Sequence, residues 1–332
     1  MEELELIVVQ LQEARNMIRK GRTAHLRLAF ILLDSVTELI LHRSVQVELW
    51  DQELLPQWLY QYKQLAAHGS KSAAVEAELL QERVIPQSQL NKIDRNFDAK
   101  SAFLIERGVL DPTLGPVLEK LHKYRNEMYH RDKLRREIIR PATLIYFDCA
   151  CTVLNEYRHL HALYGPFSTL SPGLKRYAAA DDLGLVRHDL PKRISDGLRR
   201  EVGLDLAQVR KALGDYLQAR LDQVRDGLTF LEDNLGLRDL VPGDALRLVQ
   251  ANLTPKMTLE QVRGRKYPYS KADLERWQSL ISALESIGDK HQLVRDYAYV
   301  EDSFEPFERQ VEKAVLDLDR EIVLREEFAR GK

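Results

Sequence analysis

Hydrophobic residues recur every three or four positions along most of this chain, which is the pattern of amphipathic helices. Over about residues 2–20, one apolar stripe is formed by Leu4, Ile7, Val8, Leu11, Ala14 and Ile18. Gly21 interrupts the pattern, and Thr23 is a candidate N-cap for a second helix that reaches about residue 50. This second helix is apolar on more than one face, so we expect it at the centre of a helical bundle.

A narrow polar stripe runs along this second helix. Arg27, Asp34, Glu38 and His42 fall within about 80° of one another on a helical wheel. A buried carboxylate needs a partner, so we expect Asp34 and Glu38 to be buried and salt-bridged to Arg27 or His42. A role in a functional site is the alternative.

The rest of the chain also has helical patterns, separated by Gly and Pro. Short helical pieces between residues 51 and 116 include 74–84 and 89–106, and a helix that begins at Pro116 leads into residues 120–140. Pro141 opens another helix, which ends near Tyr164. After a Gly/Pro/Ser-rich stretch at 165–173, helices are expected at about 204–234, 244–251, 271–287 and 304–328. We therefore predict an all-α fold with two domains, 1–165 and 166–332.

The composition supports this prediction and excludes several classes of protein. The chain of 332 residues has only 16 Gly and 12 Pro, which disfavours a many-stranded β-fold, and its formal net charge is −2. No apolar run approaches the roughly 18–20 residues of a membrane span, and the N-terminus lacks the features of a signal peptide. We expect a cytosolic protein that does not bind membranes, with no global positive field to attract nucleic acid.

The cysteines and histidines do not predict a metal site. Cys149 and Cys151 are the two cysteines of the chain, and at this spacing on a helix their side chains point apart, so we expect both in the core. The chain has no Walker A loop, no G-x-G-x-x-G after a strand and no H-E-x-x-H pair. We predict no metal and no other cofactor.

A basic segment at residues 120–140 carries the most informative chemistry. It contains eight Lys or Arg against three acidic residues, which is most often a solvated helix face. However, it also contains Arg125, Asn126 and His130. A guanidinium can hold a phosphate with two hydrogen bonds, and an imidazole transfers protons near neutral pH. Arg125 and His130 would point about 140° apart on one straight helix. They can converge only if the helix ends or bends, or if a second copy completes the site.

The string LHKYRNEMYH at residues 121–130 resembles the R-x(4–6)-H signature of HEPN domains, which lies between the last two helices of a helical bundle. The opening segment ARNMIRKGRTAHLRLAFILLDSVTELILHRSV resembles the first paired helices of that family. NFDAKSAFLIERGVL resembles the lead-in to its motif helix. The resemblance covers about residues 1–165, so it predicts a HEPN-like bundle followed by a helical C-terminal region.

The resemblance implies a function and roles for individual residues. HEPN domains form dimers in which two motifs meet in a cleft, and many are metal-independent endoribonucleases. By this likeness Arg125 would hold the scissile phosphate, and Asn126 would order the motif or bind substrate. His130 would activate the ribose 2′-hydroxyl or protonate the leaving oxygen, so that products end in 2′,3′-cyclic phosphates. An acidic residue of the second helix often faces this site in the family, which makes Glu38 or Asp34 a candidate orienting acid.

The predicted function is a cytosolic endoribonuclease that acts as a toxin or effector in a prokaryotic defence or toxin–antitoxin system. Its expected partners are RNA, a second copy through the HEPN-like domain, and an antitoxin or defence-complex protein. RNA contacts are expected from Lys123, Tyr129, Arg131 and Lys133. Asp132 stands where one toxin subfamily has a tyrosine that a partner nucleotidyltransferase modifies, so the likeness does not extend to that form of regulation.

Two other interpretations remain open from the sequence. A non-catalytic HEPN scaffold or adaptor would bind a partner protein, a nucleotide or nucleic acid. A DNA-binding regulator would use the basic and aromatic residues at 263–269, although we favour an ordinary loop with inward tyrosines there. We also expect His122, one turn before Arg125, to be a surface residue.

Overall fold

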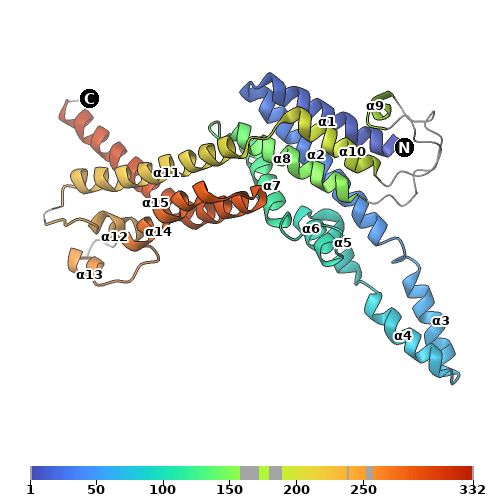
Figure 1. The fold of residues 1–332 in the computed structure, drawn as a ribbon. Helices are drawn as coiled ribbons and strands as arrows, with labels where there is room; N and C mark the ends of the chain where they lie inside the picture. The colour runs from blue at the N-terminus through green and yellow to red at the C-terminus, as the bar shows by residue number, and fades with distance from the viewer. Residues whose placement is uncertain (1, 158–171, 179–188, 238, 252–256, 331–332) are drawn as a thin grey trace. The chain divides into compact units, whose positions relative to one another are not determined.

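The described part of the protein is helical throughout, as the sequence predicts. A computed structural model describes residues 2–157, 172–178, 189–237, 239–251 and 257–330, and no strand occurs among them (Figure 1). The chain forms two compact units, Met1–Leu204 and Asp205–Lys332. No helix in the described ranges is both long and apolar enough to cross a membrane.

The first unit is built around α2 (Thr23–Glu48), which packs against α1 (Glu2–Lys20) on one side and α8 (Ile139–Glu156) on another. The buried face of α1 is the predicted stripe, and the central position predicted for α2 is confirmed. Thr23 is the first helical residue of α2 and not its cap. Arg22 occupies the N-cap position without a side-chain hydrogen bond. Cys149 and Cys151 are buried in α8, as predicted.

Three shorter helices follow, namely α5 (Gln87–Arg95), α6 (Phe97–Glu106) and α7 (Gly115–His130). Of these, α6 and α7 pack on a further face of α2, and α5 packs on α6. The single helix expected at 89–106 is two helices, because the backbone of Asn96 is extended. α7 begins next to Pro116, as predicted, and packs against α2, α6 and α8. It therefore connects the basic segment to the centre of the bundle.

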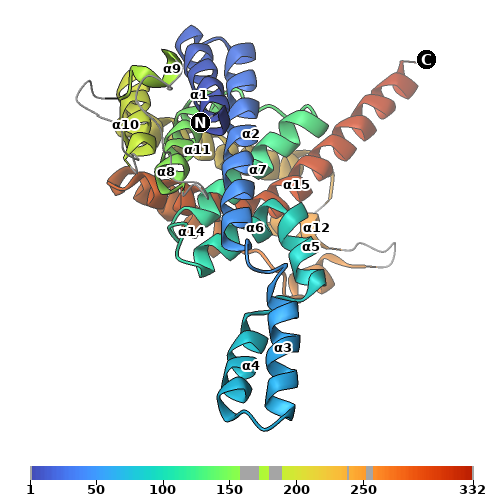
Figure 2. The ribbon, with the colours of Figure 1, turned by 90° about the vertical axis from the view of Figure 1, so that its right-hand side faces the viewer.

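Between α2 and α5 the chain forms a helical hairpin of α3 (Leu55–Ala67) and α4 (Lys71–Arg83). These two helices pack chiefly on each other, and Figure 2 shows them extending away from the other helices of the first unit. The hairpin has its own small core of Leu55, Leu59, Ala77 and Leu80.

The first unit continues beyond the boundary expected at 165/166. That boundary and the predicted helix end near Tyr164 lie outside the described residues. After a short α9 (Pro172–Lys175), α10 (Leu190–Val202) packs against α8 and α1. Because α10 completes this bundle, the two units divide between Leu204 and Asp205. No helix was predicted at the residues of α10.

The second unit consists of two long helices and several short ones. Its elements are α11 (Leu206–Asn234), α12 (Asp244–Gln250), α13 (Leu259–Arg263), α14 (Lys271–Ala283), a 3-10 turn at Leu284–Ser286, and α15 (Lys290–Ala329). α11 packs along α15, where buried Arg220 forms ion pairs with Glu301 and Glu308. α15 begins well before the predicted residue 304 and continues through Pro306.

Candidate functional site

The centre of the candidate site is Asp34, a fully buried carboxylate on α2. Its Oδ1 accepts hydrogen bonds from Nδ1 of His122 at 2.8 Å and from the Tyr146 hydroxyl at 2.7 Å. Its Oδ2 lies 3.1 Å from Nε of Arg125 in an ion pair. The carboxylate thus joins α2 to two residues of α7 and one of α8, and it holds the motif arginine in place.

His122 and Tyr146 are both fixed by this carboxylate. A carboxylate oxygen only accepts, so the proton of the His122 imidazole is on Nδ1 and Nε2 is left for other contacts. The ring of His122 also stacks on Phe97, with 4.2 Å between centroids. Burial, followed by the nearby Asp34 charge, raises the pKa of Tyr146 well above its ordinary value, so its hydroxyl stays protonated. The expectation that His122 is a surface residue is wrong, because its side chain is only 18% exposed.

The Arg125 guanidinium is held through Nε, which faces Asp34, and through Nη1. Nη1 donates to Oδ1 of Asn126 at 2.9 Å, and the guanidinium carbon lies 5.3 Å from the centre of the Tyr129 ring. Nη2 has no partner among the described residues. Arg125 is therefore oriented by Asp34 and Asn126 while one nitrogen stays available to a ligand.

His130 is the last residue of α7, and its side chain is exposed. It makes an edge contact with Tyr129, with 5.0 Å between ring centroids, and no hydrogen bond to the described residues. α7 is continuous from Arg125 to His130. Because the helix does not end between Arg125 and His130, we expect their functional groups to meet only when a second copy of the chain completes the site.

The end of α7 is tied to α2 by Arg27. Its Nη1 lies 2.8 Å from Oδ1 of Asp132, and its Nη2 donates to the carbonyl oxygen of Met128 at 2.8 Å. Asp132 has a left-handed backbone with φ of +51°, which turns the chain directly after the helix. In place of the predicted ion pair with Asp34 or Glu38, Arg27 makes these contacts, which position the segment that carries His130.

The other stripe residues of α2 have partners that the sequence did not predict. Glu38 pairs with Lys100 of α6 at 3.5 Å, and His42 lies 3.8 Å from Asp94 of α5. The expectation that Arg27 or His42 would pair with Asp34 and Glu38 is therefore wrong. Of the two candidate acids, Asp34 faces the motif and Glu38 faces α6.

Only part of the basic segment is available at the surface. Lys120 and Arg135 are buried, and Arg135 forms an ion pair with Glu127 while its guanidinium lies 4.1 Å from the centre of the Tyr124 ring. The residues expected to contact RNA are all exposed, namely Lys123, Tyr129, Arg131 and Lys133. The positive surface around the motif is thus smaller than the sequence count implies.

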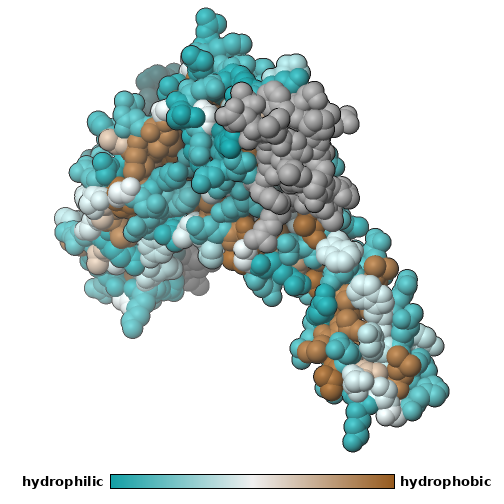
Figure 3. Space-filling view, turned by 45° about the vertical axis from the view of Figure 1, so that its right-hand side comes forward, coloured by the Kyte–Doolittle hydropathy of each residue, from teal (hydrophilic) through white to brown (hydrophobic). Residues whose placement is uncertain are grey.

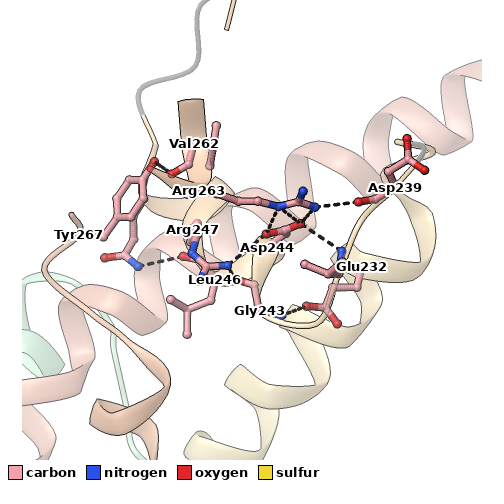
Figure 4. A network of polar contacts seen from close by, with 11 residues as sticks. Glu232, Asp239, Gly243, Asp244, Leu246, Arg247, Val262, Arg263 and Tyr267 are labelled. Carbon is pink, nitrogen blue, oxygen red and sulfur yellow. Dashed lines mark hydrogen bonds and ion pairs between the residues drawn. The ribbon is translucent and has the colours of Figure 1, made fainter. Parts of the chain in front are cut away.

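The second basic and aromatic segment, at residues 263–269, is largely committed to internal contacts (Figure 4). Arg263 pairs with buried Asp244, with Nε 3.1 Å from each carboxylate oxygen. The Tyr267 hydroxyl donates to the carbonyl of Val262, and the Tyr269 ring packs against Trp277. These contacts support the interpretation of an ordinary loop, in which Arg265 and Lys266 are the exposed basic residues.

The contacts of Asp244 predict that the stability of the second unit decreases in acid. Its hydrogen bonds from Arg263, together with the backbone N–H of Val241, hold the pKa of Asp244 below its ordinary value. A carboxyl group whose pKa is lower in the folded protein than in the unfolded chain, where it is about 4, stabilises the folded protein at pH values above about 4. This stabilisation is lost as the pH falls through the lower pKa of the folded protein. We expect Asp244→Asn to destabilise the unit at pH 7 and to weaken the dependence of its stability on pH below about 4.

Urea unfolding at pH 7, 4 and 3 measures this effect. The chain has three tryptophans, so replacing Trp50 and Trp58 by Phe leaves buried Trp277 as the reporter of the second unit. Asp233→Asn, at an exposed position of α11, is the matched control. Equal pH dependence in Asp244→Asn and the control would show that the ion pair does not stabilise the unit.

A pocket in the second unit does not suit RNA. It lies between α11 and α15, has a volume of about 330 Å³ and is lined mainly by apolar side chains such as Phe230 and Val311. Its charged lining residues are acidic, namely Asp226, Glu308 and Glu312. Glu308 is paired with Arg220, and the lining of the pocket offers no basic side chain to a phosphate backbone.

Comparisons with known proteins identify no relative. No family model matches the chain, and neither the curated proteins nor the solved structures include a significant match. The HEPN resemblance therefore rests on the residues of the motif and the segments around it.

Proposed function

We propose that this protein is a metal-independent endoribonuclease of the HEPN type, active as a homodimer in a prokaryotic defence or toxin–antitoxin setting. Arg125 holds the scissile phosphate, and His130 transfers a proton. Asp34 is the orienting acid. The alternative, a HEPN scaffold without catalysis, has the same motif geometry and differs in what His130 does.

The observation that carries this proposal is the pair of contacts from one buried carboxylate to α7. Asp34 uses Oδ2 for Arg125 and Oδ1 for His122, at 3.1 and 2.8 Å. These two α7 residues are three apart and share a face of the helix. A buried acid that fixes both an arginine and a histidine is typical of sites that must keep a reacting group in position.

The proposed reaction needs only groups of this chain and the substrate. A base takes the proton of the ribose 2′-hydroxyl, the 2′-oxygen attacks phosphorus, and an acid protonates the departing 5′-oxygen. The phosphate becomes a 2′,3′-cyclic diester. Arg125 stabilises the charge on the phosphoryl oxygens through Nη2. His122, whose Nε2 is not used by Asp34, is available as a second imidazole in addition to His130.

Two copies are part of the proposal because the motif residues diverge on one helix. We assign Arg125 of one copy and His130 of the other to the same site. Heterodimers of Arg125→Lys and His130→Ala chains test this assignment. The lysine keeps a cation beside Asp34 but loses the forked donor geometry of arginine, and the alanine removes the proton-transferring group.

Co-expression with two different tags yields the mixed dimer for this test. If arginine and histidine come from different copies, one of its two sites is intact, and it should cleave RNA at about half the wild-type rate. Each homodimer should be nearly inactive. A mixed dimer no more active than the homodimers would instead assign both residues of a site to one chain.

A further inference from the structure

His122 of α7 is held in a fixed orientation by two other helices. Its Nδ1 donates to Oδ1 of Asp34 on α2 at 2.8 Å. Its ring lies flat on the ring of Phe97 on α6, with 4.2 Å between centroids and 6° between the ring planes. These two contacts fix the imidazole and leave Nε2 as the polar atom that can meet another molecule.

Nε2 of His122 reaches the surface. The side chain is 18% exposed. Nε2 has no hydrogen-bond partner among the described residues, and it does not belong to the buried polar atoms that lack one. Because the proton of the neutral ring is on Nδ1, Nε2 carries the lone pair. The accessible atom of this imidazole is therefore the one that can accept a proton.

The carboxylate of Asp34 also relates His122 to the motif arginine. Its Oδ2 lies 3.1 Å from Nε of Arg125, while Oδ1 accepts from His122. Residues three apart share a face of a helix, so a phosphate bound by Arg125 lies on the face of α7 that carries the imidazole. His130 is about 140° away from Arg125 around the same helix.

A carboxylate behind an imidazole is an arrangement that supports a general base. It keeps the ring in the required tautomer and stabilises the imidazolium that forms when Nε2 takes a proton. Asp34 is fully buried, so water does not compete for this contact. His130 makes no hydrogen bond to the described residues and has no such support.

We propose that His122 is the general base of the ribonuclease reaction and acts in the same chain as the Arg125 that holds the phosphate. This inference rests on the proposed function. Nε2 of His122 takes the proton of the 2′-hydroxyl as the 2′-oxygen bonds to phosphorus. The bond from phosphorus to the 5′-oxygen breaks, and His130 of the second copy gives its proton to that oxygen. Solvent then takes the proton from His122 and restores the one on His130.

Replacing His122 by asparagine tests the role of Nε2. The asparagine amide can donate to Asp34 as Nδ1 does, but it has no basic nitrogen, so the rate of cleavage of a defined RNA should fall about 10²–10⁴-fold. Tyr146→Phe removes a hydrogen bond to the same carboxylate oxygen without removing a proton-transferring group, and it should lower the rate less than about tenfold. Equal losses in the two variants would limit His122 to a structural role.

The control at a distance from the site is His68→Asn, at the exposed end of α3. His68 belongs to the α3–α4 hairpin, which Figure 3 shows with apolar side chains on its visible face. This variant makes the same chemical change away from the motif, so it should retain the wild-type rate.

Mixed dimers test whether His122 acts in the chain of its own Arg125. With His122→Asn on the Arg125→Lys chain and His130→Ala on the other, one site keeps all three groups, and about half the wild-type rate should remain. With His122→Asn moved to the His130→Ala chain, the rate should fall to that of the homodimers. The opposite result would assign His122 to the chain that supplies His130.

An RNA with sulfur in place of the bridging 5′-oxygen at the cleaved linkage separates base from acid. A thiolate leaves without being protonated, so His130→Ala should come within about tenfold of the wild type on this substrate, while His122→Asn stays at least about 100-fold below it. The reverse pattern would make His122 the acid and overturn the inference. Cleavage to cyclic ends by the wild type and by His122→Asn at equal rates would overturn the inference alone, whereas a wild type that cleaves no RNA would overturn the proposed function with it.

Discussion

Replacing His130 by alanine is expected to lower the rate of RNA cleavage by about 10²–10⁴-fold, the usual contribution of a general acid or base. His130 is exposed at the end of α7 and makes no hydrogen bond to the described residues. The substitution should therefore leave the unfolding temperature and the oligomeric mass unchanged. Initial rates on a defined RNA, together with thermal unfolding, measure both effects.

The matched control for this variant is His68→Ala. His68 is also exposed, at the end of α3, where its Nδ1 contacts the carbonyl of Gln64. It should retain the wild-type rate. If His130→Ala keeps the wild-type rate as well, the motif histidine has no catalytic role and the scaffold interpretation gains support.

Replacing Asp34 by alanine should have the largest effect on stability among the site variants. The change leaves Arg125 without its ion-pair partner, and it leaves His122 and the Tyr146 hydroxyl without their hydrogen-bond acceptor. Removal of one partner of a buried ion pair typically costs about 3–5 kcal/mol. We expect a loss of this size in the free energy of unfolding, measured by urea denaturation.

The isosteric variant Asp34→Asn separates orientation from folding. It keeps the shape of the side chain and one acceptor oxygen, so it should destabilise the protein less than alanine does. It also removes the charge that holds Arg125, so the cleavage rate should fall at least about tenfold. Asp94→Asn, an exposed acid of α5 near the same helix, is the control. Wild-type cleavage by Asp34→Asn would limit Asp34 to a structural role.

The periodicity of the chain predicted the fold better than it predicted the neighbours of each helix. The stripe of α1 and the central position of α2 follow from which residues are apolar, because burial depends on a face and not on a particular partner. The packing of α10 against α8 extends the first unit to residue 204. Such a contact does not alter the local pattern of either helix.

The sequence could predict the motif residues of the site but not the contacts that hold them in place. Arg125, Asn126 and His130 lie within six consecutive residues, so their chemistry can be recognised from spacing. Asp34 bonds His122 and Tyr146 across 88 and 112 residues of chain, and spacing carries no information about such pairs. The polar stripe on an apolar helix was the available signal, because buried polar groups need partners. It identified Asp34 as a residue of interest without naming those partners.

The most direct test of the ribonuclease proposal is the chemistry of the product ends. Purified wild-type protein is incubated with mixed RNAs, including tRNA, in EDTA, and the fragments are analysed for terminal phosphates. We expect cleavage without a divalent metal, with 2′,3′-cyclic phosphate ends that are absent with His130→Ala. Cleavage that stops in EDTA, ends without a cyclic phosphate, or no cleavage of any RNA by the wild type would contradict the proposal.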